Sequence, residues 1–548
     1  MGPRIPPDWP TTDLVTHRVK TTPDRTAVVD ADTGKEWTYR EFDRRVDAVA
    51  AGLVTETDLE RGSDERVGVL LHTGLAFASL CFAAMRVGVT LVPLNVRETA
   101  SELESKVERT DPTALVCEPA TADLAVDLSR ADPGANRVVR SLPSIGRADT
   151  GNETRDDERS RRTRAQNEDR KIDPLVDPTT PVPDATLEAP DPVALDRSTT
   201  QFVLFTSGTS GDPKGVRLTV GNLVASATAS AFRLGVSPDD RWLCCLPMYH
   251  MGGLAPVIRS ALYGTAVVVQ RAFDPEATAR VVGEYDVTGV SLVPTMLERL
   301  LEAGWSPPES LRFVLLGGAP ASEDLLERCD RVGVPAYPTY GMTETASQIA
   351  TATPGARTTA PGTVGHPLAF ADVSIVDDDG VVMESGRRGE IVVDGPMVTP
   401  GYLEDRQTEA AFGPHGLHTG DVGYRDEDGF LWVLGRRDDR IVSGGENVDP
   451  SEVVDVLEAQ SGVRRAAVVG LPDEEWGERV SALVVPENPS TPPSVESLIA
   501  HCRDGLAGFK CPKTVAVVDD GTLPRTPSGT IDREAVRELI ERTGRDVS

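Results

Sequence analysis

Short apolar runs alternate with helix-like segments along the chain, and this alternation is the strongest constraint on its fold. "RVGVLL" (66–71), "TLVPLN" (90–95) and "TALVCEP" (113–119) have the length and composition of buried strands, and "AFASLCFAAMRVG" (76–88) resembles a helix between two of them. A similar alternation continues to about residue 340. Strands that alternate with helices predict parallel sheets covered by helices, which is an α/β architecture.

The pattern changes toward the C-terminus. From 370 to 434 the apolar runs shorten, and Asp-Gly pairs at 379–380 and 428–429 predict hairpin turns. Beyond them a smaller α/β unit runs to the end. Because 548 residues exceed one core, we expect two domains. They are a large domain over 1–435, with layered α/β subdomains and a small β-barrel-like part, and a small α+β domain over 436–548.

Residues 146–196 differ from the rest of the chain in composition. "GRADTGNETRDDERSRRTRAQNEDRKID" contains one aliphatic residue other than alanine, and a proline-rich stretch follows it. Such a segment cannot bury enough apolar surface to become ordered. We predict a disordered surface insertion; a segment that binds a partner is the alternative.

The charge of the chain limits the kinds of molecule that it is expected to bind. The net charge is −30 and only seven lysines are present, which argues against nucleic-acid binding and suits a salt-rich cytoplasm. No apolar run is long enough to span a membrane, and the N-terminus lacks an apolar signal core, so we expect a cytoplasmic protein. The seven cysteines contain no C-x-x-C pair and are expected to be reduced.

A loop of small residues follows the apolar strand "FVLF" (202–205). It reads Thr206-Ser-Gly-Thr-Ser-Gly and ends in an Asp-Pro-Lys-Gly turn that carries Lys214. Glycines let backbone N–H groups approach an anion, hydroxyls add donors, and the lysine adds charge. The stretch therefore predicts a phosphate-binding loop. Its spacing is not that of a Walker A loop, and the alternative is a solvated linker.

Five motifs in order make the chain resemble the acyl-adenylate-forming superfamily, which includes acyl-CoA ligases. They are "FTSGTSGDPKGV" (205–216), "YGMTET" (340–345), "HTGDVG" (418–423), "GRRDDRIVSGGENVDP" (435–450) and "LPRTPSG" (523–529). The resemblance implies that a carboxylate is joined to the α-phosphate of ATP with loss of pyrophosphate, and that a thiol then takes the acyl group. It also implies a mobile C-terminal domain, and ATP, Mg²⁺ and coenzyme A as cofactors.

The resemblance assigns roles to specific residues. The implied catalytic residues are Thr206, Lys214, His250, Thr343 and Glu344. The implied cofactor-binding residues are Ser207, Gly208, Thr209, Ser210, Gly211, Gly317, Gly318, Ala319, Pro320, Tyr340, Gly341, Met342, Asp421, Arg436, Gly444 and Gly445.

Several of these residue types also suit the chemistry by themselves. A carboxylate such as Glu344 suits a hard cation like Mg²⁺, which also binds phosphate. Asp421 could accept the ribose hydroxyls and Arg436 could donate to them, and Tyr340 could stack on adenine. The alternative for Asp421 is an ordinary turn aspartate, and the alternative for Tyr340 is an aromatic ring of the core.

The C-terminal motifs imply movement, and they contain one departure. Asp438 stands at the position of the family's hinge, and the glycines at 444–445 would line a pantetheine tunnel; a surface turn is the alternative. Thr530 stands where the family has a lysine that stabilises charge during adenylation. Nearby basic residues are Lys510, Lys513, Arg525 and Arg533.

The acid is suggested by further resemblance. "LPMYHMGGL" (246–254) resembles the acyl-pocket segment, and "YGMTETASQIAT" looks most like the 2-succinylbenzoate–CoA ligases of menaquinone synthesis. The resemblance makes His250, Arg259, Ser347 and Gln348 substrate-binding residues. Arg259 could pair with the benzoate carboxylate, or it could be a solvated helix arginine.

We therefore predict an acid–CoA ligase that acts on 2-succinylbenzoate, as this resemblance implies. Its partners are this small carboxylic acid, ATP and CoA, and it acts as a monomer or a homodimer. The alternatives are a general fatty or aromatic acyl-CoA ligase, a non-catalytic nucleotide-binding protein and a domain that loads a carrier protein.

Overall fold

The structure is a computed structural model that describes most of the chain. The described residues are 10–57, 59–131, 137–142, 172, 190–206, 213–437, 441–443, 446–448, 450–473, 476–518, 522–526 and 531–547. Most of the predicted insertion over 146–196 lies outside them. The chain divides into two compact units, and the first contains Met1–Thr358, Pro367–Asp372 and Asp394–Phe412. The second contains Thr359–His366, Val373–Val393 and Gly413–Ser548.

One sheet of the first unit has six strands in the order β6-β5-β3-β4-β7-β8. Its strands are parallel except for the last pair, β7 and β8. The strands are β6 (Val138–Ser141), β5 (Ala114–Cys117), β3 (Arg66–Leu70), β4 (Thr90–Pro93), β7 (Thr200–Thr206) and β8 (Lys214–Thr219). The helices within residues 14–131 are α1 (Leu14–Thr21), α2 (Tyr39–Glu56), α3 (Leu75–Val87), α4 (Ala100–Thr110) and α5 (Ala122–Ala131).

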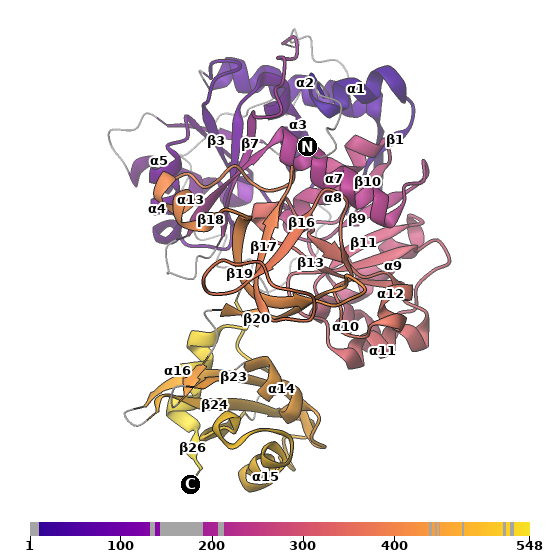
Figure 1. Ribbon diagram of the computed structural model, residues 1–548. Helices are drawn as coiled ribbons and strands as arrows, with labels where there is room; N and C mark the ends of the chain where they lie inside the picture. Colours follow the sequence, from indigo (N-terminus) through magenta and orange to yellow (C-terminus); the bar gives the residue numbers. More distant parts are fainter. Residues whose placement is uncertain are drawn as a thin grey trace, which may run out of the picture. The chain divides into compact units, whose positions relative to one another are not determined.

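The other sheet has nine strands in the order β15-β14-β13-β12-β11-β9-β10-β1-β2 (Figure 1). The strands from β13 to β1 are parallel. The strands are β15 (His366–Pro367), β14 (Ala350–Thr351), β13 (Ala336–Tyr340), β12 (Phe313–Leu316), β11 (Gly289–Leu292), β9 (Arg241–Cys244), β10 (Ala266–Val269), β1 (Thr26–Asp30) and β2 (Lys35–Thr38). The helices that connect them are α7 (Val220–Leu234), α8 (Met251–Tyr263), α9 (Pro275–Glu284), α10 (Pro294–Glu302) and α11 (Glu323–Val332).

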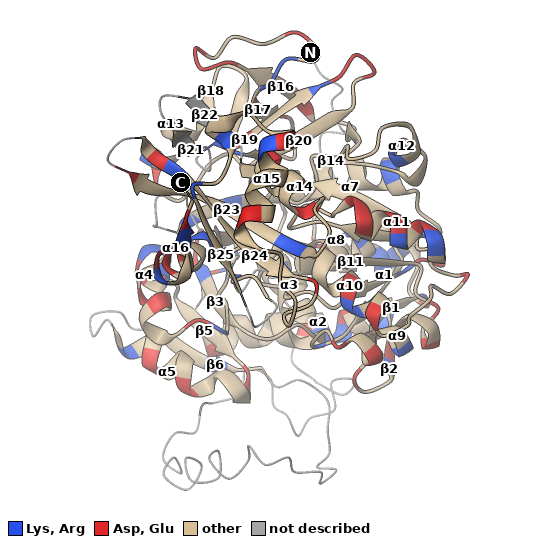
Figure 2. Cartoon of the chain, turned by 90° about the horizontal axis from the view of Figure 1, so that it is seen from below, with Lys and Arg blue, Asp and Glu red and all other residues tan. Residues whose placement is uncertain are grey.

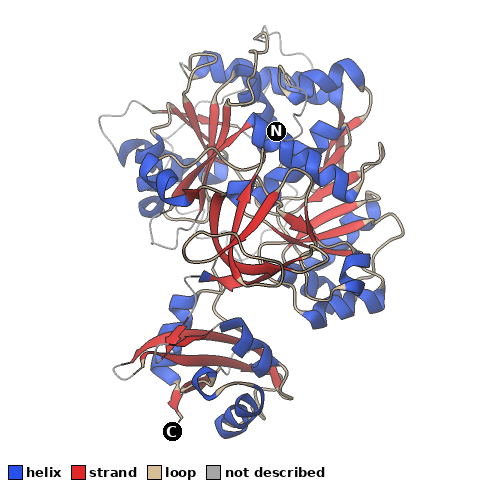
Figure 3. Ribbon diagram, in the orientation of Figure 1, coloured by secondary structure: helices blue, strands red, loops and turns tan. Residues whose placement is uncertain are grey.

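Local sequence explains where these elements begin and end. The central strands β10, β11 and β12 are buried along their whole length, as continuous apolar runs between helices should be. Asp274 caps α9 by accepting the N–H of Ala277, and Pro275 occupies the first helical turn. Helices lie along both sheets of the first unit (Figure 3). The predicted α/β architecture is confirmed.

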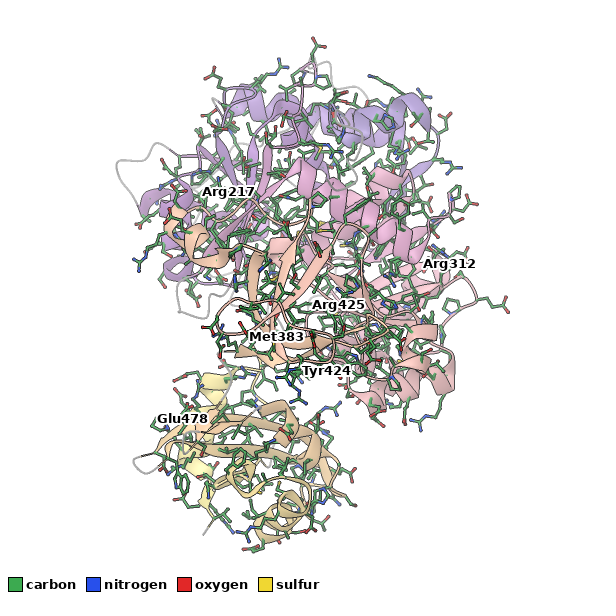
Figure 4. All side chains as sticks on the ribbon, viewed as in Figure 1. Arg217, Arg312, Met383, Tyr424, Arg425 and Glu478 are labelled. Atoms are coloured by element: carbon green, nitrogen blue, oxygen red, sulfur yellow. The ribbon has the colours of Figure 1, made fainter. Side chains whose placement is uncertain are left out.

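The second unit begins with a sheet of short antiparallel strands. Its strands are β16 (Asp372–Val376), β17 (Gly389–Asp394), β18 (Phe412–Gly413), β19 (Gly416–Arg425) and β20 (Leu431–Arg436). Gly380 and Gly429 have φ of +79° and +84°, so both predicted Asp-Gly turns form. Arg425 donates from Nη1 to the carbonyl of Val373 at 3.2 Å, and Tyr424 stacks on Trp432 (Figure 4).

The β-barrel-like part predicted for this region needs correction. Among the described residues the strands form an open sheet in the order β16-β17-β19-β18, with β20 paired to β19, and not a closed barrel. β16 and β18 stand at the two ends of this order and do not pair with each other, so the described sheet is open.

The remainder of the second unit contains a six-stranded mixed sheet with helices on both faces. Its strands are β21 (Ile441–Ser443), β22 (Glu446–Val448), β23 (Val463–Asp473), β24 (Gly477–Pro486), β25 (Thr514–Val517) and β26 (Arg545–Asp546). Its helices are α14 (Pro450–Glu458), α15 (Val495–Gly505) and α16 (Arg533–Thr543). One face packs on α14 and α15 and the other on α16. The boundary predicted at 435/436 stays a prediction.

Acidic and basic residues are interspersed along helices such as α4 and α11 (Figure 2). All seven cysteines are buried free thiols, and burial raises the pKa of Cys245 to about 12. Within the described ranges, no helix has both the length and the apolar character needed to cross a bilayer.

Candidate functional site

Several predicted site residues follow the carboxyl ends of neighbouring parallel strands. The segment that leads to His250 follows β9, Gly317 to Pro320 follow β12, and Tyr340 ends β13. Because β9, β11, β12 and β13 are parallel, these segments emerge at one edge of the nine-stranded sheet. In open α/β sheets this edge is where ligands bind.

Backbone contacts require glycine at two of these positions. A Cβ on Gly341 would lie 1.7 Å from the carbonyl oxygen of Ser347, and Gly318 has a φ of +80°. Both glycines were predicted to be cofactor-binding residues. The structure gives them a local reason as well, because the chain folds back on itself here.

Glu344 lies at the centre of a contact network from three distant parts of the chain. It belongs to a 3₁₀ turn, Thr343–Thr345, and is 5% exposed. The hydroxyl of Tyr402 donates to Glu344 Oε1 at 3.0 Å, and the ammonium of Lys214 lies 5.3 Å from the centre of the Tyr402 ring. The structure therefore places Lys214 and Glu344 on either side of one tyrosine.

Tyr402 was not predicted from the sequence. It forms an isolated antiparallel bridge with Val216 of β8, nearly two hundred residues earlier. The N–H of Thr399 also donates to the carbonyl of Glu344 at 2.7 Å. A Gly-Tyr pair after a strand is the only local signal, and it does not reveal these distant partners.

The described ends of the phosphate loop lie side by side. Thr206 on β7 pairs with Lys214 on β8 across antiparallel strands. The guanidinium of Arg109 donates from Nη1 to the carbonyl of Pro213 at 2.6 Å and lies 5.4 Å from the Phe205 ring. The loop residues predicted to bind phosphate, Ser207, Gly208, Thr209, Ser210 and Gly211, lie outside the described residues.

The segment after Glu344 has unusual backbone angles. Ala346 and Ser347 have φ of +49° and +120°, a region that residues other than glycine rarely adopt. Such strain often occurs at active sites, where the surrounding structure maintains it. The hydroxyl of Ser226 donates to the carbonyl of Ala346 at 2.8 Å and supports this conformation.

Gln348 is buried, and its amide is partly engaged. Its Nε2 donates to Thr351 Oγ1 at 2.7 Å, whereas its Oε1 has no hydrogen-bond partner among the described residues. If Gln348 contacts the substrate as predicted, the atom that makes the contact is therefore Oε1. Ser347, the other predicted contact, is only partly buried.

His250 occupies the N-cap position of α8 without a side-chain cap hydrogen bond, and its ring packs against that of Tyr249, with 4.8 Å between ring centres. Burial, together with the positive charges of Lys106 and Arg97, lowers the pKa of His250 to about 4. The imidazole is therefore neutral at pH 7, able to donate or accept a hydrogen bond but not to act as a cation.

This shift predicts a pH dependence of folding. Between pH 6.5 and about 4 the unfolded chain protonates His250 and the folded chain does not. Stability that is present above pH 6.5 is thus lost on acidification, by about 3 kcal/mol in total. Urea unfolding of His250→Asn should show a smaller loss than the parent between these pH values. The exposed His415→Asn is the control, and equal pH slopes for all three proteins would refute the shift.

Arg259 is a buried cation that forms no ion pair with any residue the structure describes. It is 1% exposed, so it is not the solvated helix arginine of the alternative. Its guanidinium lies 5.4 Å from the centre of the Trp242 ring, and neither Nη1 nor Nη2 has a hydrogen-bond partner among the described residues. By contrast, the buried Arg357 donates to the carbonyls of Ala336 and Leu326 and pairs with Asp330. Burial lowers the pKa of Arg259, and an unpaired buried charge is costly.

In the second unit, the structure brings Asp421 and Arg436 together. They oppose each other on β19 and β20, and Arg436 Nε lies 2.8 Å from Asp421 Oδ1. Asp421 is buried, while nearly half of the Arg436 side chain is exposed. Carboxylate and guanidinium are thus prearranged as neighbouring acceptor and donor, as the predicted ribose site requires.

The remaining predicted positions lie at or beyond the limits of the described residues. Asp438, Gly444, Gly445 and Thr530 are outside them. Two of the basic residues near Thr530 are engaged elsewhere. Lys510 Nζ lies 2.6 Å from both carboxylate oxygens of Glu452, and Lys513 lies over the Trp476 ring at 4.9 Å.

The donor set fits a magnesium ion that is shared with a nucleotide. Within the described ranges, no three His, Cys, Asp or Glu side chains form a metal-binding group. Mg²⁺ commonly binds through one or two carboxylates together with substrate phosphates, so Glu344 alone is sufficient for that mode.

Comparison with known proteins identifies the class of this α/β protein. The AMP-binding enzyme family model matches residues 15–403, and the model of the AMP-binding enzyme C-terminal domain matches residues 452–530. The chain belongs to the AMP-binding enzyme family.

Individual relatives indicate a narrower group within this family. A 2-succinylbenzoate–CoA ligase of Bacillus cereus is 35% identical over 538 residues, covering 98% of each chain. The o-succinylbenzoate CoA synthetase (MenE) from Bacillus subtilis, solved with the acyl-adenylate intermediate OSB-AMP, superposes with a TM-score of 0.80 at 32% identity over 96% of this chain and 98% of that one. Its complex with ATP and magnesium gives a TM-score of 0.79 at 31% identity, over 97% and 99%. The predicted family, and the predicted similarity to these ligases, are confirmed.

Proposed function

We propose that the chain is an ATP- and Mg²⁺-dependent acid–CoA ligase that converts 2-succinylbenzoate, through its acyl-adenylate, to the CoA thioester of menaquinone synthesis. The observation that carries the choice of acid is Arg259, a buried guanidinium whose Nη1 and Nη2 have no hydrogen-bond partner among the residues that the structure describes. The names and ligands of the related ligases support the same acid and cofactors.

The second carboxylate of this acid suits Arg259. One carboxylate of 2-succinylbenzoate is activated, and the aromatic carboxylate stays charged. A guanidinium can bind a carboxylate through two parallel hydrogen bonds, and its charge compensates that of the ligand. A fatty acid would bring only an apolar chain to this position and leave the arginine unpaired.

In the first half-reaction, an oxygen of the succinyl carboxylate attacks the α-phosphorus of ATP and the bond to pyrophosphate breaks. Lys214, Thr206 and Thr343 would donate to phosphate oxygens. Glu344 would hold Mg²⁺, which supplies positive charge to the phosphates when bound. In the second half-reaction the CoA thiolate attacks the acyl carbon and AMP leaves.

The other predicted contacts hold the nucleotide and CoA. Tyr340 would stack on adenine, and Asp421 with Arg436 would bind the ribose hydroxyls. Neutral His250 would contact the activated carboxylate without adding charge. A hinge at Asp438, and a pantetheine passage at 444–445, are part of the same proposal.

The test is acid-dependent ATP–pyrophosphate exchange, measured from low to molar potassium chloride with 2-succinylbenzoate, fatty acids and aromatic monocarboxylates. Exchange with 2-succinylbenzoate alone is the expected result, and it should rise with salt because screening relieves the repulsion of 30 net negative charges. Exchange only with other acids would indicate a general ligase. ATP binding without exchange would indicate a nucleotide-binding protein, with Thr530→Lys as the variant to restore activity.

A further inference from the structure

A buried carboxylate outside the predicted site organises the strand that carries Asp421. Glu390 lies on β17 and is 9% exposed. Its Oε2 accepts hydrogen bonds from His418 Nδ1 and Arg437 Nη1, each at 3.0 Å. Its Oε1 accepts the backbone N–H of Gly420 at 3.1 Å. One side chain thus binds three donors, two of them on β19.

The Gly420 contact lies at an irregularity of the sheet. Glu390 pairs with Val422 and Val392 pairs with His418, so residues 419–421 of β19 oppose the single residue Ile391 of β17. The excess residues form a bulge that contains Asp421, and Gly420 within it has a φ of +73°. Bulges remove backbone groups from the ladder and redirect side chains, and they are frequent beside active sites.

Side chains satisfy the backbone groups that the bulge leaves unpaired. Glu390 accepts the N–H of Gly420, and Thr419 Oγ1 accepts the N–H of Asp421 at 3.1 Å while donating to the carbonyl of Ile391 at 2.7 Å. A buried N–H without such a partner would destabilise the bulge and favour regular pairing. A regular register would turn Asp421 to a different direction.

Glu390 also fixes the strand opposite Asp421. Arg437 follows Arg436, the partner of Asp421, and its guanidinium joins Glu390 to the exposed Asp378, which it contacts at 2.8 Å. On β20 the register shifts again, because Leu434 is inserted between the paired residues Val433 and Gly435. Both residues of the Asp421–Arg436 pair therefore lie next to groups that bind Glu390.

We propose that Glu390 is a positioning residue for the nucleotide ribose, acting through the bulge at 419–421 and through Arg437. The inference rests on the proposed ribose contacts of Asp421 and Arg436. Replacing the carboxylate of Glu390 by an amide keeps the shape of the side chain. It removes the negative charge to which His418, Arg437 and the N–H of Gly420 donate. The Asp421–Arg436 pair then loses its fixed direction, and the ribose hydroxyls lose their hydrogen bonds.

The experiment compares kcat/KM for ATP and 2′,3′-dideoxy-ATP, in acid-dependent pyrophosphate release, for the parent chain, Glu390→Gln and Asp378→Asn. The parent should prefer ATP by roughly 10- to 100-fold, the value of hydrogen bonds to charged groups. Glu390→Gln should lose about tenfold with ATP and little with dideoxy-ATP. Asp378→Asn, which removes only the exposed partner of Arg437, should behave as the parent.

The other outcomes distinguish the positioning role of Glu390 from the ribose contacts of Asp421 and Arg436. Equal losses of Glu390→Gln on both nucleotides, in a protein with the parent's circular dichroism, would overturn the positioning role and leave the ribose site intact. A parent chain that uses both nucleotides equally would overturn the ribose contacts themselves. If Glu390→Gln does not fold, Glu390→Asp, which keeps the charge but shortens its reach, should show the same nucleotide-selective loss; an unselective loss refutes the inference.

Discussion

Arg259→Leu should abolish most activity with 2-succinylbenzoate while leaving the protein as stable as the parent or more so. The substitution removes a buried charge that has no counterion in the described part of the chain, so the unfolding free energy should not fall and should rise by about 1 kcal/mol. Loss of a desolvated partner of a substrate carboxylate should lower kcat/KM by about 10²- to 10³-fold. Pyrophosphate exchange and urea unfolding measure the two effects separately.

A second buried arginine provides the matched control. Arg357 is also buried, but its guanidinium is bonded to two carbonyls and Asp330. Arg357→Leu should therefore destabilise the chain by about 2 kcal/mol and leave the relative rates with different acids unchanged. If Arg259→Leu behaves in the same way, Arg259 is structural. An aromatic monocarboxylate, which has no second charge, should be unaffected or improved by Arg259→Leu.

Glu344→Gln should lower adenylation by about 10³-fold, which corresponds to about 4 kcal/mol of transition-state stabilisation. The amide oxygen can still accept from Tyr402, so the fold should persist, but the charge available to Mg²⁺ is lost. The magnesium concentration for half-maximal exchange should rise in the variant. This shift separates a metal ligand from a residue that only supports the fold.

Tyr402→Phe isolates the hydrogen bond from the charge. It removes the donor to Glu344 Oε1 but keeps the ring beneath Lys214, so exchange should fall only about tenfold. If Tyr402→Phe and Glu344→Gln lose equal activity with unchanged magnesium dependence, Glu344 acts by supporting its surroundings and not by binding the metal.

The sequence predicted features that depend on short segments. Apolar runs such as 66–71 and 113–119 became buried strands, and the Asp-Gly pairs became turns, because strand burial and turn angles are decided locally. The motifs also identified the family. Whether residues 370–434 form a barrel or an open sheet depends on whether the first and last strands of the sheet pair with each other. The β-barrel-like part predicted for these residues was wrong.

The contacts that surround the candidate site were not predictable in the same way. Tyr402 contacts Glu344, Trp242 contacts Arg259 and Glu390 contacts Gly420, and each pair joins separate elements. Residue type alone left Arg259 open between a solvated and a buried arginine. Its exposure of 1% in the folded chain excludes the solvated arginine.

The path of the chain between the two compact units has a consequence for synthesis. The first unit takes residues up to 358, then 367–372 and 394–412, with segments of the second unit in between. Tyr402 and Thr399, which donate hydrogen bonds to Glu344, belong to the last of these segments, 394–412. A nascent chain that has emerged only to residue 358 has both large sheets nearly complete but lacks these partners. A ribosome must therefore translate well into the open sheet of the second unit before Glu344 can acquire its native environment.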